Sequence, residues 1–254
     1  MTSISTRVNL LLMNKGLTAR QTQILKSLVE QYIETAEPVG SDSLEKKFSL
    51  GVSPATVRNE MAHLTKLKYL RQPHTSAGRV PTPTAMKFYI DQLMEEKQMS
   101  VADEVKTKEE VIGAKEDIYS LMREATHALA ERTNSLAVGT VDDERVWHSG
   151  YANIFNHPEF ADLDLSISLF ALLDESGRIQ ELFFERMTGT SPIEVIFGED
   201  LGWSGLNYIS VVGTRFKLRD RDCALGVVGP ERTKYPSIIP VLRYFKNLME
   251  EIAG

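Results

Sequence analysis

Apolar residues recur at helical spacing through the first part of the chain. Thr18 and Gln21 have the form of a capping box, and the apolar positions behind them predict a helix that ends near Pro38. A second, short helix is expected over residues 41–48, where Leu44 and Phe48 lie one turn apart.

A third helix and a hairpin follow. Ser53 as N-cap with Pro54 at the first helical position predicts a helix that runs to about Lys68. Residues 69–82 alternate poorly and contain two prolines and a glycine, which favours a hairpin, and a fourth helix is expected over 84–99. Three short helices before a hairpin indicate a winged helix-turn-helix; the alternative is a four-helix subdomain with a surface loop.

The remainder of the chain predicts an α+β domain. Residues 100–117 are polar and charged, which indicates a linker or a solvated helix, and an amphipathic helix begins near Ile118. Helices are also expected within 158–187, with a break at 175–177, and over 234–252. The expected strands share β-branched residues: 135–141, 145–148, 193–197, 208–218 and 223–228. We therefore expect a DNA-binding domain at 1–99, a linker or solvated helix at 100–117 and a regulatory and dimerisation domain at 118–254.

The charges of the 254-residue chain are distributed unevenly. Residues 1–97 contain 13 Lys and Arg against 9 Asp and Glu, whereas the rest contains 16 against 26, which gives the net charge of −6. A basic first third suits a polyanion such as DNA, although chance clustering is the alternative. The apolar run at 8–13 is too short for a signal-peptide core or a membrane span, and a single cysteine suits a reducing compartment. We expect a cytoplasmic protein without a membrane partner.

The third helix carries side chains suited to reading bases. Its outward face holds Ala55, Asn59 and Lys66 with Arg58 at the edge, and small residues there allow close approach to DNA. Arginine can bind guanine, and asparagine adenine, through two hydrogen bonds. Ser53 and Thr56 in the first turn suit a phosphate oxygen. For this helix alone, an ordinary solvated face is an equal alternative.

The hairpin strengthens the DNA-binding interpretation. His74, Thr75, Ser76 and Arg79 are small or cationic donors around Gly78, which we expect to make the sharp reversal. Such a tip can follow a phosphate strand or place Arg79 in a minor groove. The alternative for the hairpin alone is a polar surface loop.

These motifs together resemble a known family. VSPATVRNEMAHL followed by LRQPHTSAGRVPT, with EQYIETAEPVGSDSL upstream, resembles the N-terminal domain of the heat-inducible transcription repressors, HrcA. GYANIFNHPEFADL, IFGED, ISVVGTRF and LGVVGPERTKYPSIIPVLRYFKNLMEEI resemble the family's C-terminal region, in the same order.

The resemblance implies a dimeric repressor of chaperone genes. It implies double-stranded DNA as partner, in the form of an inverted-repeat operator called CIRCE, and maintenance of the active form by the GroE chaperonin. It implies operator contacts from Ser53, Ala55, Thr56, Arg58 and Asn59 on the helix, and a wing formed by His74, Thr75, Ser76 and Arg79. For the second part of the chain it implies a GAF-like domain.

The chain also departs from this family. Members carry an inserted dimerising domain within the GAF-like domain, whereas here Leu136–Val141 is followed almost at once by Arg145–Tyr151. We therefore expect the insertion and two of the GAF-like strands to be absent. Dimerisation is then expected to use the helix that begins near Ile118, the remaining sheet and the last helix.

Other chemistry finds little support in the sequence. The five histidines lack metal-ligand spacing, no cofactor motif is present, and Cys223 lies in an apolar strand, so we expect no metal, no cofactor and no enzyme. A basic run from Arg215 to Arg221 suits a solvated strand edge better than an anion site. The alternative function is a winged-helix regulator of other genes that senses a ligand through its GAF-like domain.

Overall fold

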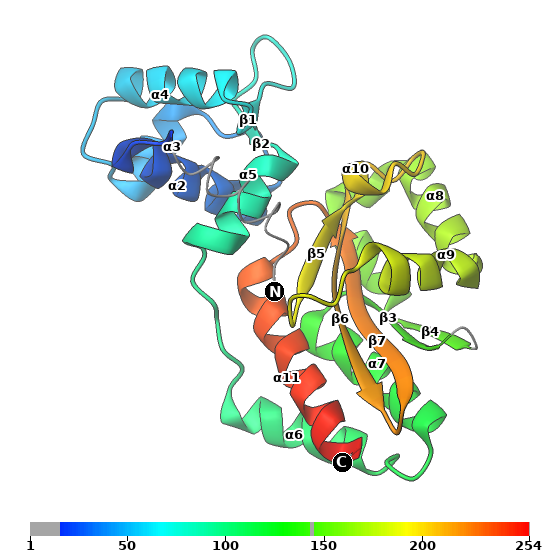
Figure 1. Ribbon diagram of the computed structural model, residues 1–254. Coiled ribbons are helices and arrows are strands. Elements are labelled where there is room, and N and C mark those ends of the chain that lie inside the picture. The colour runs from blue at the N-terminus through cyan, green and yellow to red at the C-terminus, as the bar shows by residue number, and fades with distance from the viewer. Residues whose placement is uncertain (1–15, 143–144, 254) are drawn as a thin grey trace. The chain divides into compact units, whose positions relative to one another are not determined.

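The computed structural model describes residues 16–142 and 145–253 and divides into two compact units. The first unit ends at Glu95 and the second begins at Glu96 (Figure 1). The apolar run at 8–13 lies outside the described residues. Within the described residues, no helix combines the length and the apolar character needed to cross a membrane.

The first unit contains helices around a two-stranded sheet. Its elements in chain order are α2 (Ala19–Thr35), α3 (Ser41–Phe48), α4 (Pro54–Lys66), β1 (Leu70–Arg71), β2 (Val80–Pro81), α5 (Pro83–Phe88) and the π-helical turn η1 (Tyr89–Leu93). Thr18 and Gln21 form both hydrogen bonds of the capping box at the start of α2, which confirms that prediction. The fourth helix ends at Leu93 rather than near residue 99, because the polar residues that follow supply no further apolar face.

The core of the first unit is built from the apolar faces of its helices. Ile24 and Leu28 of α2 and Val57 and Leu64 of α4 are completely or almost completely buried. This packing fixes which face of α4 remains in solvent.

The second unit is a five-stranded antiparallel sheet with the strand order β4-β3-β7-β6-β5. Its strands are β3 (Leu136–Val141), β4 (Arg145–Ser149), β5 (Glu194–Phe197), β6 (Ile209–Leu218) and β7 (Arg221–Pro230). Arg219 and Asp220 join β6 and β7 with positive φ angles of 47° and 67°, in a two-residue turn that matches the twist of a hairpin. The expected α+β fold class is confirmed.

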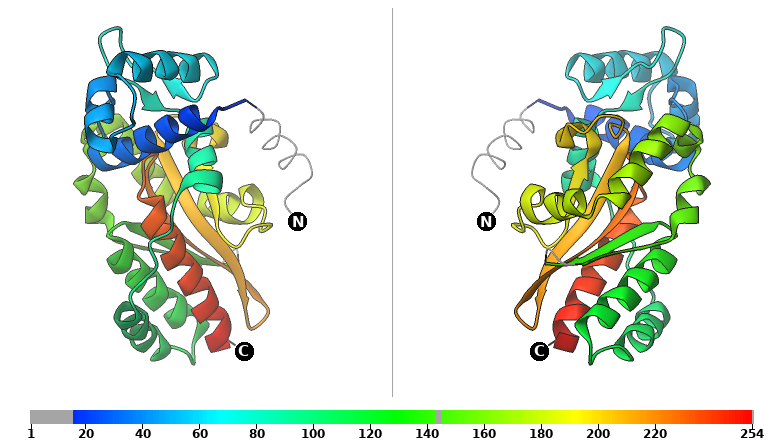
Figure 2. Two further views of the ribbon diagram at one scale, coloured as in Figure 1. Left: turned by 90° about the vertical axis from the view of Figure 1, so that its left-hand side faces the viewer. Right: turned by 90° about the vertical axis from the view of Figure 1, so that its right-hand side faces the viewer.

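Helices cover both faces of this sheet (Figures 1 and 2). The helical elements are α6 (Val101–Ile112), α7 (Ile118–Thr133), η2 (Tyr151–Asn156), η3 (Pro158–Ala161), α8 (Leu163–Asp174), α9 (Ser176–Gln180), η4 (Glu181–Arg186), α10 (Gly198–Leu201) and α11 (Tyr235–Ala253). Alternation along β3 separates the layers: Val138 joins the core formed with α8 and α9, whereas the next residue, Gly139, faces Met122 and Thr126 of α7.

The segment expected as a linker or solvated helix contains α6. Thr107 and Val111 on one side of α6 are completely buried, and Arg132 of α7 donates a hydrogen bond to the Thr107 hydroxyl at 2.7 Å. The helix therefore packs on the second unit with one face and remains solvated on the other. The break expected at residues 175–177 falls between α8 and α9.

Candidate nucleic-acid interface

The start of α4 is fixed by its cap. The Ser53 hydroxyl accepts a hydrogen bond from the Thr56 amide at 3.2 Å and lies 3.0 Å from the Thr56 hydroxyl, while Pro54 occupies the first turn. This arrangement follows from the sequence, because serine is a favourable N-cap and proline needs no amide partner at that position. Both hydroxyl groups are thereby held at the positive end of the helix.

The two faces of α4 differ sharply in burial. Val57, Met61 and Leu64 are buried in the core of the first unit. The predicted DNA-contacting residues of the outward face are on the solvent side, and all of them are exposed: Ala55, Arg58, Asn59 and Lys66. The structure therefore brings these four residues of the sequence prediction together on one surface of a rigid helix.

Arg58 extends from α4 toward the start of α3. Its Nη2 atom lies 4.0 Å from Oδ2 of Asp42, and the two side chains are 73% and 68% exposed. An ion pair so open to solvent contributes at most about 1 kcal/mol. Arg58 is therefore held only weakly and can turn toward another acceptor.

The hairpin is a wing of two short strands and a loop. β1 and β2 pair antiparallel, with Arg71 opposite Val80. The Gln72 side-chain amide donates to the carbonyl oxygens of Thr75 and Ala77 at 2.9 and 3.0 Å, which holds the loop in shape. The tip residues His74, Thr75 and Ser76 are exposed, as their proposed role requires.

Gly78 has a different role from the expected reversal. Its φ angle is not in the left-handed region, but a Cβ atom there would lie 2.4 Å from the carbonyl oxygen of Val39. Glycine at this position allows the wing to approach the segment before α3. The chain reversal is made by the turn from His74 to Ala77, with Thr75 and Ser76 at its centre, where the Ala77 amide donates to the His74 carbonyl at 2.9 Å.

The structure places Arg79 at the base of the wing rather than at its tip. Its backbone forms two hydrogen bonds with Val39, of 2.8 and 2.9 Å, and its Nε donates to the Thr65 hydroxyl of α4 at 3.2 Å. Arg79 is half-buried and joins the wing to α4. Among the predicted wing residues, Arg79 therefore has a structural role in addition to its positive charge.

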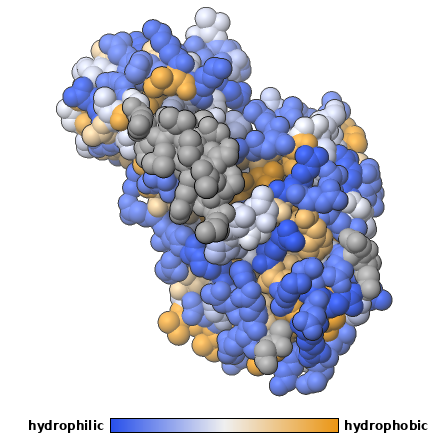
Figure 3. Space-filling view, viewed as in Figure 1, coloured by the Kyte–Doolittle hydropathy of each residue, from blue (hydrophilic) through white to orange (hydrophobic). Residues whose placement is uncertain are grey.

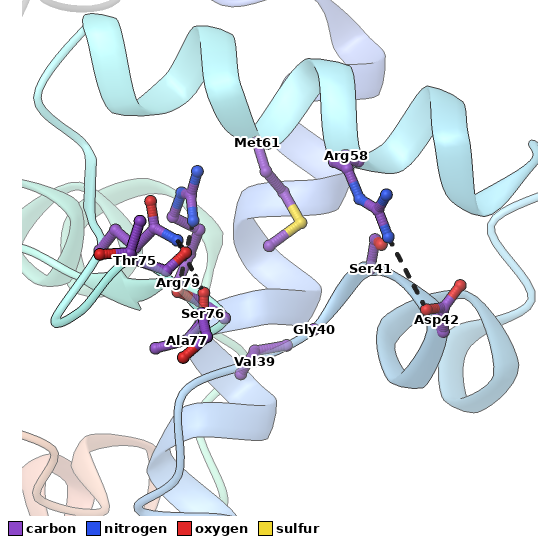
Figure 4. A pocket seen from close by; sticks show the side chains of 12 residues that line it. Val39, Gly40, Ser41, Asp42, Arg58, Met61, Thr75, Ser76, Ala77 and Arg79 are labelled. Carbon is purple, nitrogen blue, oxygen red and sulfur yellow. Dashed lines mark hydrogen bonds and ion pairs between the residues drawn. The ribbon is translucent and has the colours of Figure 1, made fainter.

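A groove of about 370 Å³ lies between the wing, α4 and the start of α3. Figure 4 shows Arg58 and Met61 on α4, the segment from Val39 to Asp42 below them, and Thr75, Ser76 and Ala77 of the wing on the other side. Sequence reasoning missed the start of α3 as part of this surface. No sequence signal marks this segment, because its N-cap, Gly40, supplies no side-chain acceptor and the first turn carries the exposed carboxylate of Asp42.

The second unit contains the chain's single cysteine, Cys223. Burial raises the pKa of the Cys223 thiol to about 12, so this residue is a core thiol and not a nucleophile. No group of three or more His, Cys, Asp or Glu side chains among residues 16–142 and 145–253 is placed to hold a metal ion. Figure 3 shows a largely hydrophilic face interrupted by apolar patches.

The basic run on β6 and β7 is engaged within the second unit. Arg215 donates to a backbone carbonyl group in η4 at 3.3 Å and to one just after η4 at 3.1 Å. Arg219 donates to two backbone carbonyl groups just before α7, at 2.7 and 3.0 Å. Lys217 lies 3.0 Å from Asp222, and Arg221 pairs with Asp142. These contacts give the cations structural roles.

Comparison with known proteins likewise distinguishes an N-terminal and a C-terminal part of the chain. Residues 16–96 match the family model of the winged helix-turn-helix transcription repressor, HrcA DNA-binding, and residues 83–239 match that of the HrcA protein C terminal domain. A crystal structure of a hypothetical protein shares the fold, with a TM-score of 0.71, 19% identity, and coverage of 93% of this chain and 98% of that one.

Curated relatives extend over nearly the whole chain. The heat-inducible transcription repressor HrcA of Carboxydothermus hydrogenoformans is 25% identical over 336 residues, which covers 92% of this chain and 98% of that protein. The HrcA of Thermomicrobium roseum is 36% identical over 173 residues, covering 68% of this chain and 48% of that protein. Because the alignment of 336 residues is longer than this 254-residue chain, the first relative contains sequence that has no counterpart here. The chain belongs to the HrcA family of heat-inducible transcription repressors, which are not enzymes, and its first unit is the family's winged-helix DNA-binding domain.

Proposed function

We propose that this protein represses chaperone genes by binding an inverted-repeat operator of the CIRCE type as a homodimer. The observation that carries the proposal is the exposed face of α4 beside the wing tip, with a groove between them. Both surfaces belong to one compact unit, so they are presented to a duplex together.

The base-reading step is assigned to α4. Arg58 and Asn59 are exposed next to each other, and the small side chain of Ala55 one turn earlier lets the helix enter a major groove. Arg58 would leave its weak ion pair with Asp42 and bind guanine through O6 and N7, while Asn59 would bind adenine. Lys66 at the end of α4 would neutralise a phosphate.

Phosphate contacts are assigned to the helix start and the wing. Ser53 and Thr56 present hydroxyl groups at the positive end of α4, where a phosphate oxygen is stabilised. His74, Thr75 and Ser76 are exposed at the wing tip and are held in place by Gln72. Arg79 would add its charge at the base of the wing without giving up its structural contacts.

The operator, the dimer, the chaperone genes and the GroE chaperonin are proposed from the family. A dimer would place two α4 helices in successive major grooves of a palindromic site, which mirrors the two-fold symmetry of the protein. We propose that the chaperonin, if it acts on this chain, acts through the second unit.

The competing proposal is a ligand-sensing regulator of other genes. The second unit contains a cavity of about 250 Å³ at β4 and α7, lined by residues such as Arg123, His127 and Trp147. Small-molecule sites generally measure about 300–1,000 Å³. This cavity is smaller, so we favour control by protein partners over control by a small ligand.

The deciding experiment measures binding of the full chain to a labelled CIRCE-type inverted repeat and to a scrambled duplex of equal length, at 50 and 200 mM salt. Specific binding typically exceeds non-specific binding by about 10³-fold or more, and both weaken as the salt concentration rises, so the ratio of the two affinities at each salt concentration is the readout. Equal affinity for the two duplexes would contradict the proposed operator. Selective binding to a different sequence would support the competing proposal.

A further inference from the structure

Helix α8 carries large apolar side chains on both its buried and its exposed face. Leu165, Leu169 and Leu172 on one face are buried in the core of the second unit. On the opposite face, Leu163 and Ile167 are 70% and 57% exposed, and the helix contains no lysine or arginine. Its charged residues, Asp164 and Asp174, lie near the two ends, so the middle of the helix presents an uncharged surface with a large exposed aliphatic side chain. Among the described residues of the second unit, no element covers the outer face of α8.

Two aromatic residues of η2 extend this outer face. Tyr151 and Phe155 are 44% and 60% exposed, and each of their rings lies 6.3 Å from the ring of Phe170 on α8. Beside them on the edge strand β4, the His148 ring lies 6.0 Å from the Tyr151 ring at a tilt of 47°, and its buried Nε2 has no hydrogen-bond partner among the described residues. We call the continuous apolar surface the α8 face, which consists of Tyr151, Phe155, Leu163, Ile167 and Phe170.

The α8 face has the size expected of the apolar part of a stable interface. A large side chain buries about 150–250 Å² when it is covered, so the exposed portions of its four most exposed residues come to about 400 Å². A standard interface buries about 800 Å² on each partner, of which somewhat more than half is apolar. The α8 face therefore supplies most of the apolar area of one side, and its polar surroundings can supply the rim.

The arrangement of the α8 face suits a second copy of the same chain. α8 has 12 residues, which corresponds to about 18 Å, and Ile167 lies near its middle. An antiparallel pair related by a two-fold axis at Ile167 would place Leu163 of one copy against the turn at Phe170 of the other. In this register Asp164 lies opposite position 170 of the partner and Asp174 lies near the positive start of the partner's helix, and the helix dipoles oppose each other favourably.

We propose that the protein forms a homodimer through the α8 face. The proposal deepens the proposed function, which needs two copies on one operator. It replaces the expectation that the dimer uses α7, the remaining sheet and α11, because the apolar residues of these two helices are buried within the unit: Leu121, Met122, Leu242, Phe245 and Leu248.

Sedimentation of the full chain at micromolar concentration tests the proposal. The wild-type protein is expected to sediment as a dimer. Ile167→Glu should raise the dissociation constant by about 100-fold or more, because two glutamates would meet in an apolar contact. The matched control is Val105→Glu on α6, whose side chain is 53% exposed and which packs on the other layer of the unit. A monomeric wild type, or a dimer disrupted by the control and not by Ile167→Glu, would overturn the proposal.

A cross-link tests the two-fold axis directly. A cysteine at position 167 in an Ile167→Cys variant would lie beside its own symmetry mate, whereas the native Cys223 is buried. Mild oxidation should therefore give a covalent dimer from Ile167→Cys and none from the wild type or from Val105→Cys. Absence of the dimer from Ile167→Cys, or equal yields from the two cysteine variants, would place the contact elsewhere and refute the register.

DNA binding separates this proposal from the proposed function. Ile167→Glu leaves α4 and the wing unchanged, so it should bind a single half-site as tightly as the wild type and lose its advantage on the inverted repeat. If the protein dimerises through α8 but shows no DNA selectivity, the proposed operator is refuted and the proposed interface stands. Selective binding by a dimer that Ile167→Glu leaves intact would refute the interface and keep the operator.

Discussion

Helices α4 and α8 each bury one face in the core of their own unit and leave the other in solvent. The exposed face of α4 carries Ala55, Arg58 and Asn59, whereas the exposed face of α8 carries Leu163 and Ile167. The buried faces are similar, because both consist of large aliphatic side chains. The two helices differ in the side chains that they expose to solvent.

This difference indicates two kinds of partner. Small and hydrogen-bonding side chains allow close approach to base edges and lose little when they are left in water. Large apolar side chains gain free energy only when another apolar surface covers them, by roughly 25 cal/mol for each Å². The first unit is therefore suited to a polar duplex and the second to a protein surface.

The largest expected effect contrasts the two faces of α8. Leu169→Ala removes a completely buried side chain and should cost about 2–5 kcal/mol in the free energy of unfolding, whereas Ile167→Ala should cost under about 0.5 kcal/mol in the monomer. Urea unfolding followed by tryptophan fluorescence measures this, since both tryptophans, Trp147 and Trp203, lie in the second unit. The measurement requires dilution until the protein is monomeric. Equal costs would mean that the outer face of α8 is packed within the unit.

The next effect concerns the reading face of α4. Arg58→Ala should weaken operator binding by about 1–3 kcal/mol and relax the preference at one base pair. Its control is Lys66→Ala, which should weaken binding to operator and scrambled duplex alike and reduce the slope of affinity against salt by about one. Fluorescence anisotropy titrations with single-base operator variants measure both. A uniform loss with Arg58→Ala would show that Arg58 binds phosphate rather than a base.

A smaller effect separates the two roles of Ser53. Ser53→Ala removes the acceptor for the Thr56 amide and should destabilise the start of α4 by about 1 kcal/mol, visible as faster hydrogen exchange in its first turn. Ser53→Asp keeps a favourable N-cap but brings a negative charge to the same place. We expect slow exchange with Ser53→Asp and weaker DNA binding. Wild-type affinity in this variant would show that no phosphate lies near position 53.

The sequence predicted the helices of the first unit well because their local signals agree. The capping box at Thr18 and the Ser53–Pro54 cap are interactions between residues three positions apart or fewer, so they can be recognised without a fold. The strands of the second unit were recognisable for the same reason, as β-branched runs bounded by turns. The exposed face of α4 followed once its apolar face was assigned.

Features that depend on distant residues could not be predicted. The close approach of Gly78 to Val39 and the contact of Arg79 with Thr65 join segments that only the fold brings together. The outer face of α8 was hidden for a different reason. A helix rich in leucine and isoleucine looks like a core helix in sequence, and only the structure shows that Leu163 and Ile167 have nothing over them among the described residues.

The smallest expected effect is a pH dependence confined to the second unit. Burial lowers the pKa of His148 and of His157 below the usual value of 6.5, since it disfavours the charged imidazolium; nearby Asp174 opposes this for His148, and Arg232 reinforces it for His157. The unfolded chain therefore binds more protons below pH 6.5 than the folded one. The free energy of unfolding is therefore undiminished by these two histidines above about pH 6.5. It should decline as the pH falls from there toward their lower pKa in the folded state.

Urea midpoints at pH 7.5 and 5.5, followed by the fluorescence of Trp147 and Trp203, measure this decline in the second unit. His148→Gln should reduce the difference between the two midpoints, because it removes one group that must take up a proton on unfolding. His148 lies beside Tyr151 at the margin of the α8 face, so the decline should be smaller at protein concentrations where the dimer protects that margin. A decline that is independent of concentration, in a protein shown to dimerise, would indicate that the contact does not reach β4.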